Sequence, residues 1–354
     1  MEAIVLVGGQ GTRLRPLTLT TPKPMLPVAN VPFITHQLLR LSAAGVTHVV
    51  LATSYRAEVF AAYLGDGAQL GLTIDYVTET DPLGTGGGIR NASAALRGGP
   101  DAPVIVLNGD VLSGHDIRAQ VELHNASAAD ATLHLVVVDD ARAFGCVPTD
   151  TDGRVTAFLE KMPQPVSNQI NAGCYVLRRN VIDEIPADVV LSVERQTFPE
   201  LLAAGARVQG YIESAYWLDV GTPAAIVQAS ADLVRGIAPS PAVTSPGPAL
   251  VDETAQCVGA DVTGGSAIGA DAVVAAGACV DGSIVADGAV VDRDAQVLRS
   301  AIGAGARIGA GTRVVDAVIG AGARVGALNE LAAGARVWPE VELPDRAIRF
   351  SSDA

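Results

Sequence analysis

The first part of the chain alternates short, largely apolar runs with segments of helical periodicity. Runs at residues 3–7, 46–52, 72–77 and 103–110 predict strands, because a strand that is covered on both faces shows little polar surface. Residues 34–44 are predicted to form a helix between the first two strands. Such alternation is typical of a mostly parallel α/β sheet, in which ligands bind at the carboxyl ends of the strands.

The pattern changes after residue 250 to a repeat with a period of five or six residues. Within it, Ile268, Val285, Ile302 and Ile319 recur every 17 residues. Hexapeptide periods predict a parallel β-helix with triangular coils, in which one aliphatic side chain of each face points inward. The pattern resembles left-handed hexapeptide β-helices. A disordered tail rich in Ala and Gly is the alternative, and the strict spacing argues against it.

A proline-rich stretch separates the two patterns. Residues 239–248 contain four prolines, which exclude a helix or a central strand and predict a linker. We therefore predict an α/β fold in which a Rossmann-like, mostly parallel sheet is followed by a left-handed parallel β-helix. The predicted parts are a first domain at 1–236, a linker at 237–250, the β-helix at 251–345 and a tail at 346–354.

Composition narrows the class of protein. The 354 residues have a hydrophobic content of 49%, but no run reaches the length of a membrane span, and the surplus is Ala and Val spread along the chain. The apolar start lacks a basic flank and is predicted to be a strand rather than a signal peptide. The formal net charge of −14 argues against a nucleic-acid surface but leaves room for a bound nucleotide.

The cysteines and histidines give no metal site. The four cysteines, Cys146, Cys174, Cys257 and Cys279, have no metal-binding spacing and lie among apolar or small residues. We interpret them as reduced packing residues of a cytoplasmic protein. The five histidines are scattered along the chain, which excludes a zinc site by spacing.

A glycine-rich turn follows the first strand and is rich in candidate chemistry. Gly8, Gly9 and Gly11 let the backbone turn sharply, and the cations Arg13, Arg15 and Lys23 then fall within eleven residues. Backbone N–H groups and fixed cations are what a polyphosphate needs, although a tight turn with solvated arginines is the plainer alternative. The spacing does not fit a dinucleotide fingerprint, because Leu14 stands where a third glycine is needed, nor a P-loop.

Further candidates follow later strands. The stretch 78–89 is a second glycine-rich loop, and its three consecutive glycines before a helix predicted to start near Ile89 suggest close approach to a ligand. A flexible turn is the alternative. Asp110 ends an apolar strand, where it can cap a helix or bind Mg²⁺, which prefers oxygen ligands and one or two carboxylates. Asp219, in a similar setting, is the candidate for the second carboxylate.

The stretches 8–18 and 22–24 together resemble the signature of the sugar-1-phosphate nucleotidyltransferases, which reads Gly-Gly-x-Gly-Thr-Arg-Leu-x-Pro-Leu-Thr followed by Pro-Lys-Pro. The loop at residues 82–87 looks most like that of the members that form GDP-mannose, with Gly86 in place of the usual alanine. In that family the second loop lies over the nucleobase, and two aspartates bind the metal.

The resemblance implies roles for individual residues. Arg13 would hold the outer phosphates of a nucleoside triphosphate, Lys23 the α-phosphate and Lys161 the sugar phosphate, and Mg²⁺ would bind Asp110 and Asp219. We predict Arg13, Lys23, Asp110, Lys161 and Asp219 as catalytic. The predicted nucleotide-binding residues are Leu6, Gly8, Gly9, Gly11, Thr12, Arg13, Lys23, Gly84, Thr85 and Asp110. The predicted sugar-phosphate-binding residues are Gly145, Glu160, Lys161, Asn171 and Asp219. The segment 193–199 also looks like the family's, and we assign it no chemistry.

The expected reaction is transfer of a nucleoside monophosphate from GTP to mannose-1-phosphate with release of diphosphate. Uridylyl, thymidylyl or adenylyl transfer to another sugar phosphate remains open, as does a catalytically silent regulatory paralogue. A sugar-acetylating β-helix is disfavoured, because no histidine lies in residues 251–354 to act as base. The apolar exterior of the predicted coils leads us to expect a homo-oligomer formed through the β-helix, with no nucleic acid and no membrane as partner.

Overall fold

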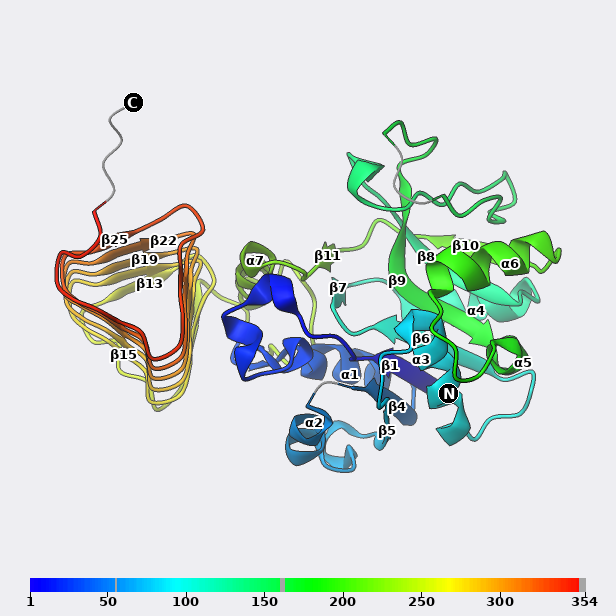
Figure 1. The fold of residues 1–354 in the computed structure, drawn as a ribbon, viewed down its shortest axis with the longest axis horizontal. Helices are drawn as coiled ribbons and strands as arrows, with labels where there is room; N and C mark the ends of the chain where they lie inside the picture. Colours follow the sequence, from blue (N-terminus) through cyan, green and yellow to red (C-terminus); the bar gives the residue numbers. More distant parts are fainter. Residues whose placement is uncertain (55, 160–162, 350–354) are drawn as a thin grey trace. The chain divides into compact units, whose positions relative to one another are not determined.

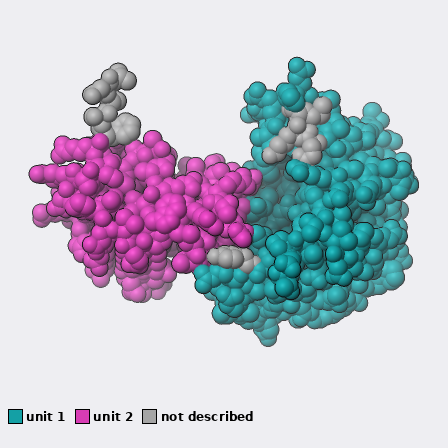
Figure 2. All heavy atoms as spheres, viewed as in Figure 1, with its two compact units in different colours: residues 1–9, 37–217 teal, residues 10–36, 218–354 magenta. Residues whose placement is uncertain are grey.

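The structure is a computed structural model that describes residues 1–54, 56–159 and 163–349. It divides into two compact units (Figure 2). Unit 1 contains residues 1–9 and 37–217, and unit 2 contains residues 10–36 and 218–354. The division falls within the glycine-rich turn after the first strand, so Gly8 and Gly9 belong to unit 1 and Gly11 belongs to unit 2. This division does not test the domain boundaries at residues 236 and 250, which stay predictions.

A seven-stranded sheet with the order β10-β8-β9-β6-β1-β4-β5 forms the centre of unit 1 (Figure 1). All neighbours in it are parallel except β9, which runs antiparallel to β6 and β8. The prediction of a mostly parallel α/β sheet is confirmed. The strands are β1 (Glu2–Leu6), β4 (His48–Thr53), β5 (Thr73–Thr78), β6 (Pro103–Asn108), β8 (Ala131–Val137), β9 (Gln169–Arg178) and β10 (Val208–Ile212).

The helices pack on this sheet through apolar side chains. Helix α3 lies against β1 and β4, and α4 lies against β6, β8 and β9. Ile4, Val50 and Val106 from three neighbouring strands are fully buried, together with Ile89 of α3. No helix in the described part of the chain has the length and apolar character that a membrane crossing needs. The helices are α1 (Phe33–Ala43), α2 (Ala57–Leu64), α3 (Gly84–Ala92), α4 (Ile117–Ala126), α5 (Arg179–Glu184) and α6 (Phe198–Ala203).

Two histidine rings stack in the interior of unit 1. The ring centroids of His115 and His134 are 3.8 Å apart, and in the part of the chain that the structure describes neither ring nitrogen of His134 has a hydrogen-bond partner. Burial lowers the pKa of His134 to about 3 and that of His124 to about 4, and it holds the pKa of His115 well below its ordinary value. These side chains are therefore neutral in the folded protein at neutral pH.

We expect the protein to become less stable as the pH falls from about 6.5 towards 4. An unfolded chain binds protons at its histidines in this window, whereas His124 and His134, with pKa values of about 4 and about 3, stay neutral while folded. The free energy of unfolding therefore rises with pH here. Urea unfolding at several pH values would measure the slope, which His124→Gln should reduce by about one proton. A constant free energy of unfolding between pH 7 and 4.5 would contradict the burial argument.

Three parallel sheets in unit 2 form the left-handed parallel β-helix that the sequence predicts (Figure 1). Successive coils pair in register, as Val280 with Val297 and Val297 with Val314. The first sheet contains β12 (Ala249–Val251), β14 (Ser266–Ile268), β17 (Ile284–Val285), β20 (Ala301–Ile302), β23 (Val318–Ile319) and β26 (Arg336–Val337). The second contains β13 (Asp261–Thr263), β16 (Cys279–Asp281), β19 (Gln296–Leu298), β22 (Arg313–Val315) and β25 (Glu330–Leu331). The third contains β15 (Val273–Val274), β18 (Val290–Val291), β21 (Arg307–Ile308), β24 (Arg324–Val325) and β27 (Glu342–Leu343).

The interior of the β-helix combines apolar stacks with a ladder of serine hydroxyls at one corner. Ile268, Val285 and Ile302 are buried, as their spacing predicts. At the corner, the backbone N–H of Ser283 donates to Ser266 Oγ at 3.1 Å, and that of Ser300 donates to Ser283 Oγ at 3.0 Å. Each hydroxyl in turn donates to a backbone carbonyl. The ladder therefore pairs buried polar groups across coils.

The outer face of the first sheet is covered by the chain itself. Ile284 and Ala301 point outward from this sheet but are at most 6% exposed, and with Ile226 of α7 (Pro223–Val234) and the segment 16–27 they line a small cavity of about 130 Å³. Asn30 Nδ2 also donates to Ile268 O at 2.7 Å. An apolar exterior was our reason to expect an oligomer, and along this face it is covered within unit 2.

Candidate functional site

The predicted site residues fall in both units, and each unit is described by itself. Unit 1 contains Leu6, Gly8, Gly9, Gly84, Thr85, Asp110, Gly145 and Asn171, and unit 2 contains Gly11, Thr12, Arg13, Lys23 and Asp219. Glu160 and Lys161, predicted to bind the sugar and its phosphate, lie outside the described residues.

In unit 1 the carboxyl ends of β1 and β6 meet at one edge of the sheet. Leu6 pairs with Asn108, and the N–H of Gly109 donates to Leu6 O at 2.9 Å. A Cβ atom on Gly109 would lie 2.5 Å from that oxygen, so only glycine fits there. The structure therefore brings the end of β1, with Gly8, next to Asp110, as the parallel arrangement of the strands predicts.

The second glycine-rich stretch differs from its prediction. Helix α3 begins at Gly84, not near Ile89, so Gly86, Gly87 and Gly88 are buried inside the helix. The reason is close packing against a later segment: a Cβ atom on Gly84 would lie 2.5 Å from Leu191 O, and one on Gly87 2.6 Å from Val189 O. The glycines therefore admit the protein's own backbone, and the predicted close approach of a ligand stays a prediction.

A chain of polar side chains connects the start of α3 to Asn171. Thr85 Oγ1 donates to a carboxylate oxygen of Glu194 at 2.8 Å and accepts from the N–H of Val193 at 2.9 Å. Tyr175 OH donates to the other carboxylate oxygen of Glu194 at 3.4 Å, and Asn171 Nδ2 donates to Tyr175 OH at 2.8 Å. A predicted nucleotide-binding residue and a predicted sugar-binding residue thus share one hydrogen-bonded network.

The sequence did not point to Tyr175 or to Glu194 as site residues, and Glu194 contacts both Thr85 and Tyr175. It lies in the π-helix η7 (Val193–Thr197), in the segment to which we assigned no chemistry. Burial and the nearby Glu194 carboxylate raise the pKa of Tyr175 well above its ordinary value, so the phenol remains a donor. The only signal in the sequence was a carboxylate between Val193 and Arg195, which equally fits a solvated position.

Gly145 lies on a loop. The residue after it, Cys146, forms backbone hydrogen bonds with Leu159, which precedes Glu160. The backbone N–H of Cys146 donates to Leu159 O at 2.8 Å, and that of Leu159 donates to Cys146 O at 2.9 Å. The aromatic ring of Phe144 packs edge-on against Trp217. Gly145 and the residues just before Glu160 are therefore neighbours within unit 1, and the sugar-phosphate role predicted for Gly145 stays a prediction.

In unit 2 the remainder of the predicted phosphate loop forms short 3-10 turns, η1 (Thr12–Leu14), η2 (Leu17–Leu19) and η3 (Lys23–Met25). Gly11 has a φ angle of 55°, in the left-handed region that favours glycine. Its carbonyl accepts hydrogen bonds from the hydroxyl of Thr18 at 2.8 Å and the N–H of Leu14 at 2.9 Å. The side chain of Leu14 is buried and anchors the loop to the interior of the protein. This explains why an apolar residue stands where a dinucleotide fingerprint would have its third glycine.

Arg13 and Asp219 converge on Gly221. A Cβ atom on Gly221 would lie 3.2 Å from Arg13 Nη2 and 3.1 Å from Asp219 Oδ1. Asp219 ends β11 (Trp217–Asp219). Unit 2 thus gathers one predicted phosphate-binding cation and one predicted metal carboxylate around a glycine that leaves space beside both.

The acidic residues fit Mg²⁺ only as part of its ligand set. Among the residues that the structure describes, no group of three or more His, Cys, Asp or Glu could hold a metal ion. Mg²⁺ commonly binds one or two carboxylates and takes its other ligands from water and substrate phosphates. Single carboxylates such as Asp110 and Asp219 are compatible with that mode, and a site made of protein ligands alone is not.

Comparisons with known proteins agree with these features. The profile of the Nucleotidyl transferase family matches residues 2–236. The chain is 56% identical to the mannose-1-phosphate guanylyltransferase of Mycobacterium tuberculosis, over 100% of this chain and 98% of that protein. It is 37% identical to mannose-1-phosphate guanylyltransferase 1 of Arabidopsis thaliana, over 79% of this chain and 78% of that protein.

Two solved proteins resemble about two thirds of this chain in structure. HddC from Yersinia pseudotuberculosis, also solved in complex with GMP-PN, is 28% identical, with a TM-score of 0.56 over 66% of this chain and 99% of that chain. A putative glucose-1-phosphate thymidylyltransferase from Bacillus anthracis is 26% identical, with a TM-score of 0.59 over 65% of this chain and 94% of that chain. With a profile that matches more than half of its length and a full-length relative of this identity, the chain belongs to the Nucleotidyl transferase family.

Proposed function

We propose that this protein is a mannose-1-phosphate guanylyltransferase, which converts GTP and mannose-1-phosphate into GDP-mannose and diphosphate. The observation that carries the proposal is the 56% identity along the whole chain with the Mycobacterium tuberculosis protein of that name. The intact set of Arg13, Lys23, Asp110, Lys161 and Asp219 argues against a catalytically silent paralogue.

In the proposed reaction, an oxygen of the sugar phosphate forms a bond to the α-phosphorus of GTP. The bond from that phosphorus to its bridging oxygen breaks, and diphosphate leaves with the electron pair. Arg13 holds the outer phosphates, Lys23 the α-phosphate and Lys161 the sugar phosphate. Asp110 and Asp219 would hold Mg²⁺, which when bound neutralises phosphate charge. Catalysis is then positioning and charge neutralisation, without a covalent intermediate.

A carboxylate within the second glycine-rich stretch supports the choice of guanine. Glu79 accepts a hydrogen bond from the N–H of Leu83 through one oxygen at 3.2 Å. Its other oxygen is 2.7 Å from the point where a Cβ atom on Gly88 would lie, and Leu6 Cδ2 is 3.6 Å from the same point. Guanine offers the two donors N1–H and N2–H₂ on one edge, whereas uracil and thymine offer one. A carboxylate accepts from both donors.

We expect Glu79→Gln to lower kcat/KM for GTP by roughly ten- to a hundredfold, the discrimination of one good bidentate contact. The amide keeps an acceptor for Leu83 but loses the second acceptor for guanine, so the slower reaction with UTP should change little. The control is Glu58→Gln, because Glu58 is exposed on α2. An equal loss with both nucleotides would contradict a role of Glu79 in base recognition.

The proposed function is tested with the purified protein, a panel of nucleoside triphosphates and sugar-1-phosphates, and release of diphosphate as the readout. GTP with mannose-1-phosphate should give the highest kcat/KM. If UTP or dTTP exceeds GTP by roughly tenfold, about 1.4 kcal/mol, the guanylyl assignment is wrong and uridylyl or thymidylyl transfer takes its place. Turnover with no substrate pair would instead support a silent regulatory paralogue.

Assembly and location remain predictions. A homo-oligomer through the β-helix now rests on the faces that α7 and the segment 16–27 leave uncovered, where Val273 and Val290 are half-buried. A mass of one chain in light scattering, independent of concentration, would exclude it.

The cytoplasmic location rests on the four cysteines, which are free thiols in the structure. Burial raises the pKa of the Cys174 thiol to about 12.

A further inference from the structure

Along the first sheet of the β-helix, one outward-pointing position is apolar in successive coils and becomes charged in the last coil. On the first sheet, the outward residues Ile284, Ala301 and Val318 follow one another in register and are nearly fully buried. The next residue of this column is Arg336, which pairs with Val318 and is exposed. An apolar column that is covered by unit 2 itself therefore ends in a cation.

The column reaches Arg336 because the last coil is one residue longer. Ala301 pairs with Val318 and Ile284 with Ala301, each 17 residues apart. A further step of 17 residues would put Ala335 in the outward position, whereas the observed pairing of Val318 with Arg336 is a step of 18. The irregular coil thus puts the one long cationic side chain of this column where the column meets the segment 10–36.

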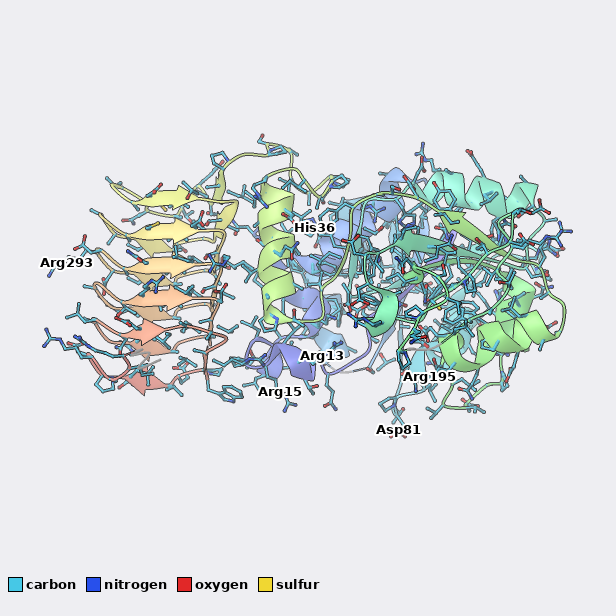
Figure 3. All side chains as sticks on the ribbon, turned by 90° about the horizontal axis from the view of Figure 1, so that it is seen from above. Arg13, Arg15, His36, Asp81, Arg195 and Arg293 are labelled. Atoms are coloured by element: carbon cyan, nitrogen blue, oxygen red, sulfur yellow. The ribbon has the colours of Figure 1, made fainter. Side chains whose placement is uncertain are left out.

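Arg336 contacts the backbone of the phosphate loop. Its Nη1 donates to Arg13 O at 3.0 Å and to Arg15 O at 2.7 Å. Figure 3 shows Arg13 and Arg15 on this segment, beside the coils of the β-helix, all within unit 2. A charged donor makes stronger hydrogen bonds than a neutral one, and these two carbonyls flank the buried Leu14. The contact fixes the backbone that carries the Arg13 side chain.

We propose that Arg336 is a positioning residue for the phosphate loop, through which the β-helix sets the orientation of Arg13 towards the outer phosphates of the nucleoside triphosphate. The proposal rests on the proposed function of Arg13. An interaction with the outer phosphates is present before and during the reaction, so its loss raises KM more than it lowers kcat. The β-helix then contributes to substrate binding, as well as to any assembly.

We expect Arg336→Ala in the full-length protein to raise KM for GTP roughly tenfold, equivalent to about 1.4 kcal/mol, with a smaller change in kcat. Amide hydrogen exchange in residues 11–19 should become faster because the loop opens more often. Arg336→Lys should restore part of the affinity, since an ammonium can still donate to both carbonyls. The matched control is Arg293→Ala, because Arg293 is an exposed arginine that projects away from the segment 10–36 (Figure 3).

Unchanged KM and unchanged exchange in Arg336→Ala would overturn the proposal, and so would faster exchange with an unchanged KM, because the contact would then be structural only. If Arg336→Ala does not fold, Arg336→Gln is compared instead. If the wild-type protein turns over no nucleoside triphosphate, the proposed function fails separately. Calorimetric binding of GTP then replaces KM: weaker binding by the variant supports the positioning role, and equal binding overturns it.

Discussion

Replacing Asp110 or Asp219 with Asn is expected to lower kcat by roughly 10²–10³, the size of effect seen when one electrostatic stabiliser of a transition state is removed. Each substitution keeps the shape of the side chain and removes its charge. Asp110 lies two residues after the end of the buried strand β6, and Asp219 ends β11 beside Gly221, so neither change disturbs the apolar core. Steady-state turnover at saturating Mg²⁺ and substrates measures the loss.

The control for these variants is Asp101→Asn, which removes an equal charge from an exposed loop. Its kcat should match that of the wild type, and all three variants should keep the wild-type circular dichroism spectrum. Near-normal kcat in either Asp110→Asn or Asp219→Asn would show that the carboxylate in question is not a metal ligand, and the motif-based assignment would have to be abandoned for that residue.

Val297→Asp is expected to cost more than about 4 kcal/mol of unfolding free energy, because it leaves an unpaired charge in a sealed core. Val297 is fully buried and stacks between Val280 and Val314 of the neighbouring coils. Thermal unfolding followed by circular dichroism should show a large drop in melting temperature, or no folded β-helix at all.

The neighbouring position provides the control. Gln296 lies on the same strand but points outward and is exposed, so Gln296→Asp adds the same charge at the same place along the chain. Its effect should stay within roughly 0.5 kcal/mol, as for ordinary surface substitutions. Similar melting temperatures for both variants would mean that the inward and outward positions of this coil are wrongly assigned.

The sequence predicts the fold well where the pattern of side chains has the same period as the backbone structure. The 17-residue recurrence that begins at Ile268 reports the inner stack of the β-helix directly, and the apolar runs report the strands of the sheet. It does not reveal that the outward column at Ile284 and Ala301 is covered by the segment 16–27. Covered and exposed Ala or Val look alike in a sequence when the covering segment lies hundreds of residues away.

The candidate site could be predicted in part. Motifs identify Arg13 and Asp219, and the structure brings both to Gly221. Glu194 escaped notice because its importance arises from contacts with Thr85 and Tyr175, more than 100 residues away in one case. The start of α3 was misplaced because glycine normally disfavours a helix interior, whereas here the residues 189–191 need the space that missing side chains leave.

The serine ladder at the corner of the β-helix has an implication for how this protein can change in length. Its rungs repeat every 17 residues, since the N–H of Ser283 meets Ser266 Oγ and the N–H of Ser300 meets Ser283 Oγ. Loss of residues 283–299 would join Gly282 to Ser300 and put an equivalent hydroxyl on the vacated rung. Around the ladder, the loss of a whole coil keeps every rung, whereas the loss of a fraction of a coil would shift the hydroxyls off the rungs. The length of the laddered part of this domain can therefore change most readily in steps of one coil.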